Sequence, residues 1–105
     1  MEKLTFQFQT NRSAAGAKKQ AIVGVVASGN LEVLLERTST PGECSIEIST
    51  AAHGFGPVWE AVLTDFIGRR PTGGLRISIN DGGARPDTVA LRLAQAVRVI
   101  EEDEI

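Results

Sequence analysis

The chain has 105 residues, the length of one small domain, and 42% of them are hydrophobic, as in an ordinary soluble globular protein. Thirteen acidic residues against eleven basic ones give a net charge of −2, so the composition predicts no basic face for nucleic acid. The longest apolar run, residues 21–27, is far shorter than the roughly 20 residues that cross a bilayer, so we expect no membrane span.

Strand patterns dominate the first half of the chain. Residues 4–8 alternate apolar and polar side chains, which predicts a half-buried strand, and the small, polar and basic residues 11–19 predict a loop. Residues 22–27 are mostly β-branched and apolar on both faces, which favours a central strand. The alternation returns at residues 31–36 and 44–49 and predicts two more strands.

Ser28, Gly29 and Asn30 separate the second and third predicted strands. Gly-Asn between two strand patterns is typical of a tight hairpin, because both residue types tolerate positive φ. We therefore expect the two strands to pair antiparallel, with Ser28 on the exposed rim of the turn.

The second half of the chain alternates helix and strand patterns. Apolar residues spaced on one helical stripe follow Pro57 and end before Gly68 and Pro71, which predicts a helix. Residues 75–79 alternate as a strand, and residues 80–83 predict a turn.

Pro86 opens a second helical stripe that ends near Ile100. The acidic run 101–104 would meet the negative end of the helix dipole, so we expect it to fray.

The predicted order is therefore β-β-β-β-α-β-α. This order favours an α+β two-layer sandwich, in which two helices cover one face of a mixed, mostly antiparallel sheet of about five strands. We expect residues 1–105 to form a single domain.

Candidate catalytic and metal-binding residues are few. His53 is the only histidine and lies in a predicted loop, and the only cysteine, Cys44, alternates in register with core positions of its strand. One histidine and one cysteine are too few for a zinc site, so we assign no catalytic residues and no metal ligands. The lone cysteine also excludes an internal disulfide, and the N-terminus shows no signal-peptide pattern, so we expect a cytoplasmic protein.

Three segments resemble one known family. Residues 24–33, GVVASGNLEV, resemble the prosthetic-group attachment segment of malonate decarboxylase acyl carrier subunits, commonly GVVGSGDLEV. Residues 54–63, GFGPVWEAVL, and residues 79–86, INDGGARP, are similar to the family's GFGxxWxALL and INDFGATP. The chain departs from the pattern at Ala27, Asn30 and Gly82, where the family commonly has Gly, Asp and Phe.

The resemblance implies a non-catalytic carrier subunit. Ser28 would hold 2'-(5''-phosphoribosyl)-3'-dephospho-CoA through a phosphodiester, with Gly29 and Asn30 shaping the turn, and the thiol of the group would hold acetyl and malonyl thioesters. The implied partners are the acyl transferase and decarboxylase subunits, the prosthetic-group transferase and the malonyl transferase.

Three other functions remain open at this point. The acyl carrier subunit of citrate lyase uses a similar prosthetic group, although its attachment segment differs and lacks the GFGxxW stretch. A small partner-binding adaptor without a prosthetic group is the second alternative. A small hydrolase is the third, and it would need His53 within hydrogen-bond reach of Ser28.

Overall fold

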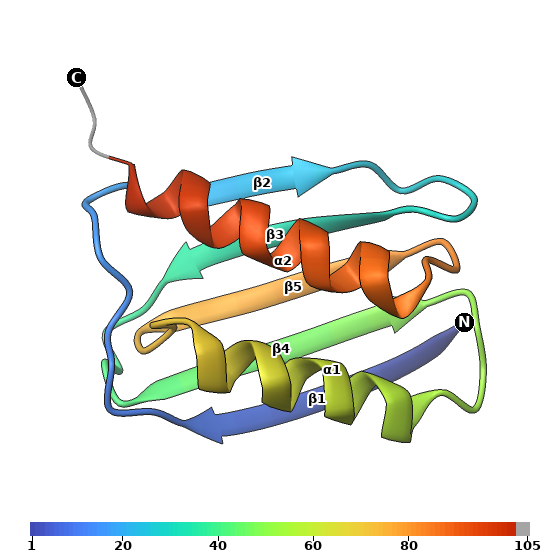
Figure 1. Ribbon diagram of the computed structural model, residues 1–105, viewed down its shortest axis with the longest axis horizontal. Helices are drawn as coiled ribbons and strands as arrows, with labels where there is room; N and C mark the ends of the chain where they lie inside the picture. The colour runs from blue at the N-terminus through green and yellow to red at the C-terminus, as the bar shows by residue number, and fades with distance from the viewer. Residues whose placement is uncertain (103–105) are drawn as a thin grey trace.

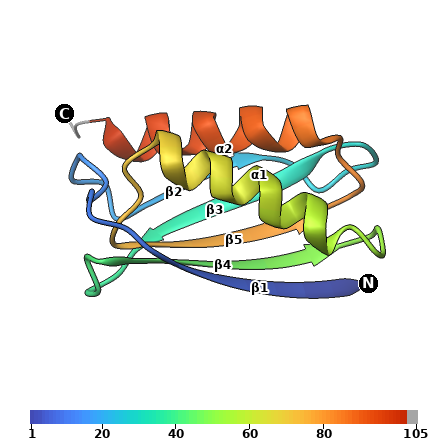
Figure 2. The same ribbon diagram turned by 60° about the horizontal axis from the view of Figure 1, so that its bottom comes forward.

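The structure is a computed structural model that describes residues 1–102. It contains a five-stranded mixed sheet with two helices over one face, as Figures 1 and 2 show, which confirms the predicted α+β class and element order. The elements are β1 (Glu2–Gln9), β2 (Gln20–Gly24), β3 (Leu31–Arg37), β4 (Glu43–Thr50), α1 (Gly56–Arg69), β5 (Leu75–Asp81) and α2 (Pro86–Glu101).

The strands are arranged in the order β1-β4-β5-β3-β2. The β4–β5 pair is parallel and the other three pairs are antiparallel, so the sheet is mixed and mostly antiparallel, as predicted. The parallel pair is connected by α1, because parallel neighbours need a crossover rather than a tight turn. β5 is therefore the middle strand, with β1 and β2 at the edges.

The core lies between the sheet and the helices. Alternate residues of β3, β4 and β5 point toward the helices and are almost fully buried, as the alternation in the sequence predicts. The helices bury one stripe each against them, formed by Trp59, Leu63 and Phe66 of α1 and by Val89, Leu93, Ala96, Val97 and Ile100 of α2. No helix within residues 1–102 is long and apolar enough to cross a membrane.

The expected central strand over residues 22–27 is wrong in two respects. β2 is an edge strand and ends at Gly24, whose φ of +85° turns the chain out of the extended conformation. Ile22, Val25 and Val26 are 61%, 55% and 52% exposed, so only Val23 of this run packs against the core.

The helix ends follow the prediction with small differences. α1 passes through Gly68 and ends at Arg69, just before the Arg70-Pro71 step, because proline disfavours helical backbone in the residue before it. α2 keeps its helical form through Glu101, and Glu102 pairs with the Nζ of Lys18 at 3.2 Å. The remainder of the acidic run, residues 103–104, lies outside the described residues.

Arg37 ties the loop between β1 and β2 to the rest of the molecule. Its guanidinium donates hydrogen bonds to the carbonyl oxygens of Ala14, Ala15 and Lys18 in that loop. It also donates to the carbonyl of Ile100, one of the α2 carbonyls that have no partner within the helix. The planar fork of the arginine thus holds the loop across the end of the sheet that is opposite Ser28.

Candidate functional site

Ser28 lies in the loop between β2 and β3, at one end of the sheet. The three loops β2–β3, β4–α1 and β5–α2 all reach this end, at the right of Figure 1. Ser28 is exposed at the tip of the first of them, and β2 and β3 pair antiparallel, as the sequence predicts.

The turn that carries Ser28 is not the one expected. The connection spans residues 25–30 and is closed by a bond from the Val25 N–H to the Leu31 carbonyl (3.1 Å). Inside it, the Asn30 N–H donates to the Ala27 carbonyl (2.9 Å), so the central residues of the tight turn are Ser28 and Gly29 rather than Gly29 and Asn30. Gly29 has a φ of +75°, a conformation that glycine supplies at the third position of such turns.

Asn30 shapes the turn through its side chain. Its φ is not positive, in contrast to the expectation. Instead, its Oδ1 accepts hydrogen bonds from the Leu31 N–H (2.8 Å) and from the Nε of Arg92 in α2 (3.3 Å). Asn30 therefore stabilises the turn by accepting a hydrogen bond from neighbouring backbone, and not by adopting a positive φ.

Gly82 joins this turn to the β5–α2 loop. The Gly82 N–H donates to the Asn30 carbonyl (2.9 Å), and the Gly29 N–H donates to the Gly82 carbonyl (3.1 Å). A Cβ at position 82 would lie 2.2 Å from the carbonyl oxygen of Ala27, so the two loops can approach this closely only because residue 82 has no side chain.

Asp81, the last residue of β5, holds the β5–α2 loop in place through its side chain. Its carboxylate is 3% exposed and accepts hydrogen bonds from the Gly83 N–H (3.1 Å), the Ala84 N–H (2.9 Å) and the Thr50 hydroxyl (2.9 Å). These bonds satisfy the buried carboxyl oxygens and connect the ends of β4 and β5. The sequence predicts residues 80–83 only as a turn, but the tendency of aspartate to accept hydrogen bonds from backbone N–H groups two or three residues ahead is a signal for this role of Asp81.

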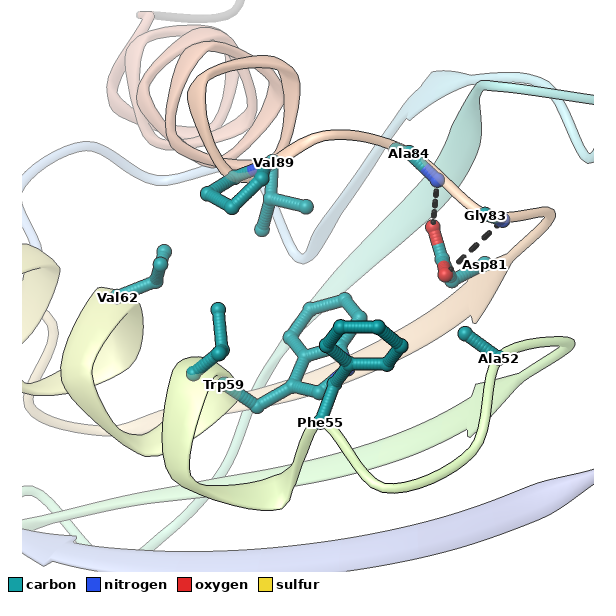
Figure 3. Close-up of a pocket in the computed structure, with 10 residues that line it drawn as sticks. Ala52, Phe55, Trp59, Val62, Asp81, Gly83, Ala84 and Val89 are labelled. Atoms are coloured by element: carbon teal, nitrogen blue, oxygen red, sulfur yellow. Dashed lines mark hydrogen bonds between the residues drawn. The ribbon is translucent and has the colours of Figure 1, made fainter.

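An apolar pocket of about 240 Å³ opens on the other side of the same loop. Figure 3 shows Phe55 and Trp59 of the α1 end facing Val89 of α2, with Asp81 and its two loop hydrogen bonds at the rim. Phe55 is 51% and Val58 42% exposed, so the pocket has an apolar edge in contact with solvent. Its lining contains no serine, cysteine, lysine or histidine, and its one carboxyl group, that of Asp81, is engaged by the loop.

The other chemical candidates lie elsewhere. Cys44 is buried in β4, and burial raises the pKa of its thiol to about 11, against a smaller opposing effect of Thr72. His53 is exposed in the β4–α1 loop, and the middle strand β5 and its loop separate it from the Ser28 turn. Within residues 1–102, no hydrogen bond joins His53 to Ser28, and no group of His, Cys, Asp and Glu side chains is placed to hold a metal ion.

Comparisons with known proteins agree on one family. The family model described as malonate decarboxylase delta subunit (MdcD) matches residues 18–100. A protein named malonate decarboxylase acyl carrier protein from Bradyrhizobium diazoefficiens is 62% identical over 103 residues, which is 98% of each chain. A protein of the same name from Burkholderia cepacia is 56% identical over 96 residues, covering 91% of this chain and 87% of that one.

A solved structure shares the fold. One chain of a crystal structure of a Pseudomonas malonate decarboxylase hetero-tetramer in complex with malonate superposes with a TM-score of 0.84 at 38% sequence identity. The similarity covers 95% of this chain and 99% of that chain. These findings favour the first of the functions considered for the sequence over a citrate lyase carrier, an adaptor or a hydrolase.

Proposed function

The chain belongs to the malonate decarboxylase delta-subunit family, and we propose that it carries 2'-(5''-phosphoribosyl)-3'-dephospho-CoA on Ser28 as the acyl carrier subunit of a malonate decarboxylase. The proposal rests on the position of Ser28, which is exposed at the tip of a turn and lies within the residues that match the family model. The whole chain would act as one carrier domain in the cytoplasm.

The surroundings of Ser28 fit a long covalent group. Ser28 is exposed, and a Cβ built on the neighbouring Gly29 would meet nothing within 4 Å, so space is open beside the hydroxyl. The turn is held at its base by the backbone bonds to Gly82 and by the side chain of Asn30. A group attached at the tip can therefore leave the surface without displacing the core.

Attachment requires only the Ser28 oxygen from this chain. The oxygen would form a bond to phosphorus of an activated triphosphate donor, pyrophosphate would leave, and the hydroxyl proton would pass to a base. No side-chain hydrogen bond to Ser28 occurs within residues 1–102, and we therefore assign the base to the prosthetic-group transferase.

The chain would contribute placement rather than catalysis. When bound, the group would supply a thiol that holds acetyl and malonyl groups as thioesters. The tether keeps that thiol at high effective concentration near successive active sites. The exposed turn presents it away from the body of the carrier.

Partner subunits would meet the end of the molecule that carries Ser28. Val25, Val26, Phe55 and Val58 expose large apolar side chains there, and patches of this kind mark interaction sites on soluble proteins. We propose the acyl transferase and decarboxylase subunits, the prosthetic-group transferase and the malonyl transferase as the proteins that dock at this end. The hetero-tetramer that contains the similar Pseudomonas chain supports such an assembly.

The test is Ser28→Ala in the complete malonate decarboxylase. Because the hydroxyl is exposed and contributes no side-chain hydrogen bond, the variant should unfold within about 0.5 kcal/mol of the wild-type apo protein. It should bind its partner subunits and support no malonate-dependent release of carbon dioxide. Added holo wild-type carrier should restore turnover.

Ser39→Ala is the matched control, since Ser39 is also an exposed loop serine but lies in the β3–β4 connection at the opposite end. It should keep full activity. A folded Ser28→Ala complex with wild-type turnover would refute the proposal, and a Ser28→Ala chain that fails to fold would show that Ser28 is structural.

A further inference from the structure

Arg92 lies on α2 directly over the base of the Ser28 turn. Its Nε donates to the Oδ1 of Asn30 (3.3 Å), and its Cδ lies 3.5 Å from the position that a Cβ on Gly24 would take. The half-buried side chain therefore hydrogen-bonds Asn30 at the end of the β2–β3 loop and lies near Gly24, the last residue of β2.

The charge of Arg92 has no carboxylate partner in the part of the chain that the structure describes. The ion pairs there are Lys18–Glu102, Arg69–Asp65, Arg76–Glu47 and Arg85–Asp87. Both groups that accept hydrogen bonds from Arg92 are neutral amides, Asn30 at 3.3 Å and Gln95 at 2.8 Å. Within residues 1–102, no carboxylate therefore balances this partly buried guanidinium.

Arginine is suited to a phosphate ligand in this position. Its planar fork carries five N–H donors that match the oxygens of a phosphate, and such charge-assisted bonds are stronger than neutral ones. The hydrogen bonds to Asn30 and Gln95 hold the fork in place and use only part of its donors. A phosphodiester on Ser28 would place a negative charge two residues before Asn30.

We propose that the Arg92 guanidinium binds the phosphate that joins the prosthetic group to Ser28. This inference rests on the proposed function and adds a non-covalent anchor to it. The anchor would hold the first part of the arm against the carrier and leave its far end free to move.

The test is a thermodynamic cycle between Arg92 and the phosphodiester. The melting temperatures of apo and holo forms are measured for the wild type, Arg92→Gln and the control Arg98→Gln, whose arginine is exposed on the same helix. Loading should raise the melting temperature of the wild type by about 4 °C relative to the same loading in Arg92→Gln. Arg98→Gln should behave as the wild type, and high salt should reduce the difference.

A merely structural role of Arg92 would lower both melting temperatures of Arg92→Gln equally, which would overturn the inference. The phosphorus NMR signal of the Ser28 phosphodiester is the second measurement, and it should shift in holo Arg92→Gln but not in holo Arg98→Gln. The side-chain Nε–H signal of wild-type Arg92 should shift on loading, which decides the question even if Arg92→Gln fails to fold or to load. An unchanged Arg92 signal in a protein loaded at Ser28 would refute the anchor alone, whereas a protein loaded elsewhere would refute the proposed function.

Discussion

Cys44 illustrates a residue whose environment the sequence predicted correctly. It alternates in register with Ile46 and Ile48, and all three are buried in β4. Burial penalises the thiolate and raises the pKa of the thiol to about 11, from 9.0 for an exposed cysteine. The thiol is therefore both inaccessible and protonated at neutral pH, so a fast-reacting thiol on the folded protein would have to come from the arm on Ser28.

The raised pKa of Cys44 predicts a loss of stability in alkali. Above pH 9 the thiol ionises in the unfolded chain but stays protonated in the folded one until about pH 11, so unfolding releases a proton. The free energy of unfolding should be unaffected by this group well below pH 9 and should fall as the pH rises from there, by about 3 kcal/mol in total once the pH has passed 11.

Denaturant unfolding of wild-type protein and Cys44→Ala between pH 8 and 11 isolates this contribution. The alanine variant is expected to be less stable at pH 8, because it leaves a small cavity, but to lose less stability as the pH rises. Parallel pH profiles for the two proteins would show that the thiol ionises equally easily in both states.

Other residues at the site could not be predicted from the sequence. Arg92 falls at a polar position of a helical pattern, and nothing local indicates that it reaches a turn more than sixty residues away. Asp81 has its Thr50 partner on a neighbouring strand. Ser28 could be proposed from the sequence because its own neighbours resemble the attachment segment of the family, whereas the groups that support its turn come from distant parts of the chain.

At the scale of elements, β2 shows why a purely apolar run was misleading. Residues 22–27 satisfy the pattern of a buried strand, but Gly24 interrupts it and the following valines are exposed beside Ser28. A run of apolar residues without alternation does not show whether its side chains lie in the core or on the surface, because hydrophobic residues also occur on the surface of soluble proteins. The alternating strands were predicted correctly because only a half-buried sheet explains a period of two.

Gly24→Ala should destabilise the protein and disturb the Ser28 turn. The φ of +85° is unfavourable for alanine, and the new Cβ would lie 2.1 Å from the carbonyl oxygen of Leu31, which is backbone and cannot swing aside. We expect the free energy of unfolding to fall by about 2 kcal/mol.

Gly68→Ala provides a control of opposite sign. Gly68 is inside α1, its φ is not positive, and a Cβ there would meet nothing within 4 Å. The same substitution should therefore stabilise the protein, by about 0.5–1 kcal/mol. Thermal and denaturant unfolding of both variants measures the two changes, and equal stability of Gly24→Ala and wild type would contradict the conformation given for the end of β2.

At the scale of the whole molecule, the sequence predicted the layers but not the strand order. Pairing of β3 with β5 and of β4 with β1 brings together residues that are distant in the chain. The periodicity of side chains along one strand does not indicate which other strand it pairs with. The resulting order places the loops after β2, β4 and β5 at one end, so that Ser28, Gly82 and the apolar pocket become neighbours. The opposite end is closed by Arg37 and the loop that it holds.

Ser28 is the proposed attachment site of the prosthetic group, and the sequence allows one direct measurement of this attachment. Trypsin cuts after Lys19 and Arg37, and the peptide between them, residues 20–37, contains Ser28 as its only hydroxyl-bearing residue. Carrier purified after expression with the complete malonate decarboxylase system is digested, and the mass of this peptide is determined. The peptide should be heavier by one phosphoribosyl-dephospho-CoA group, joined as a phosphodiester, while all other peptides should be unmodified. An unmodified 20–37 peptide in a carrier that supports malonate decarboxylation, or the group on any other peptide, would contradict it.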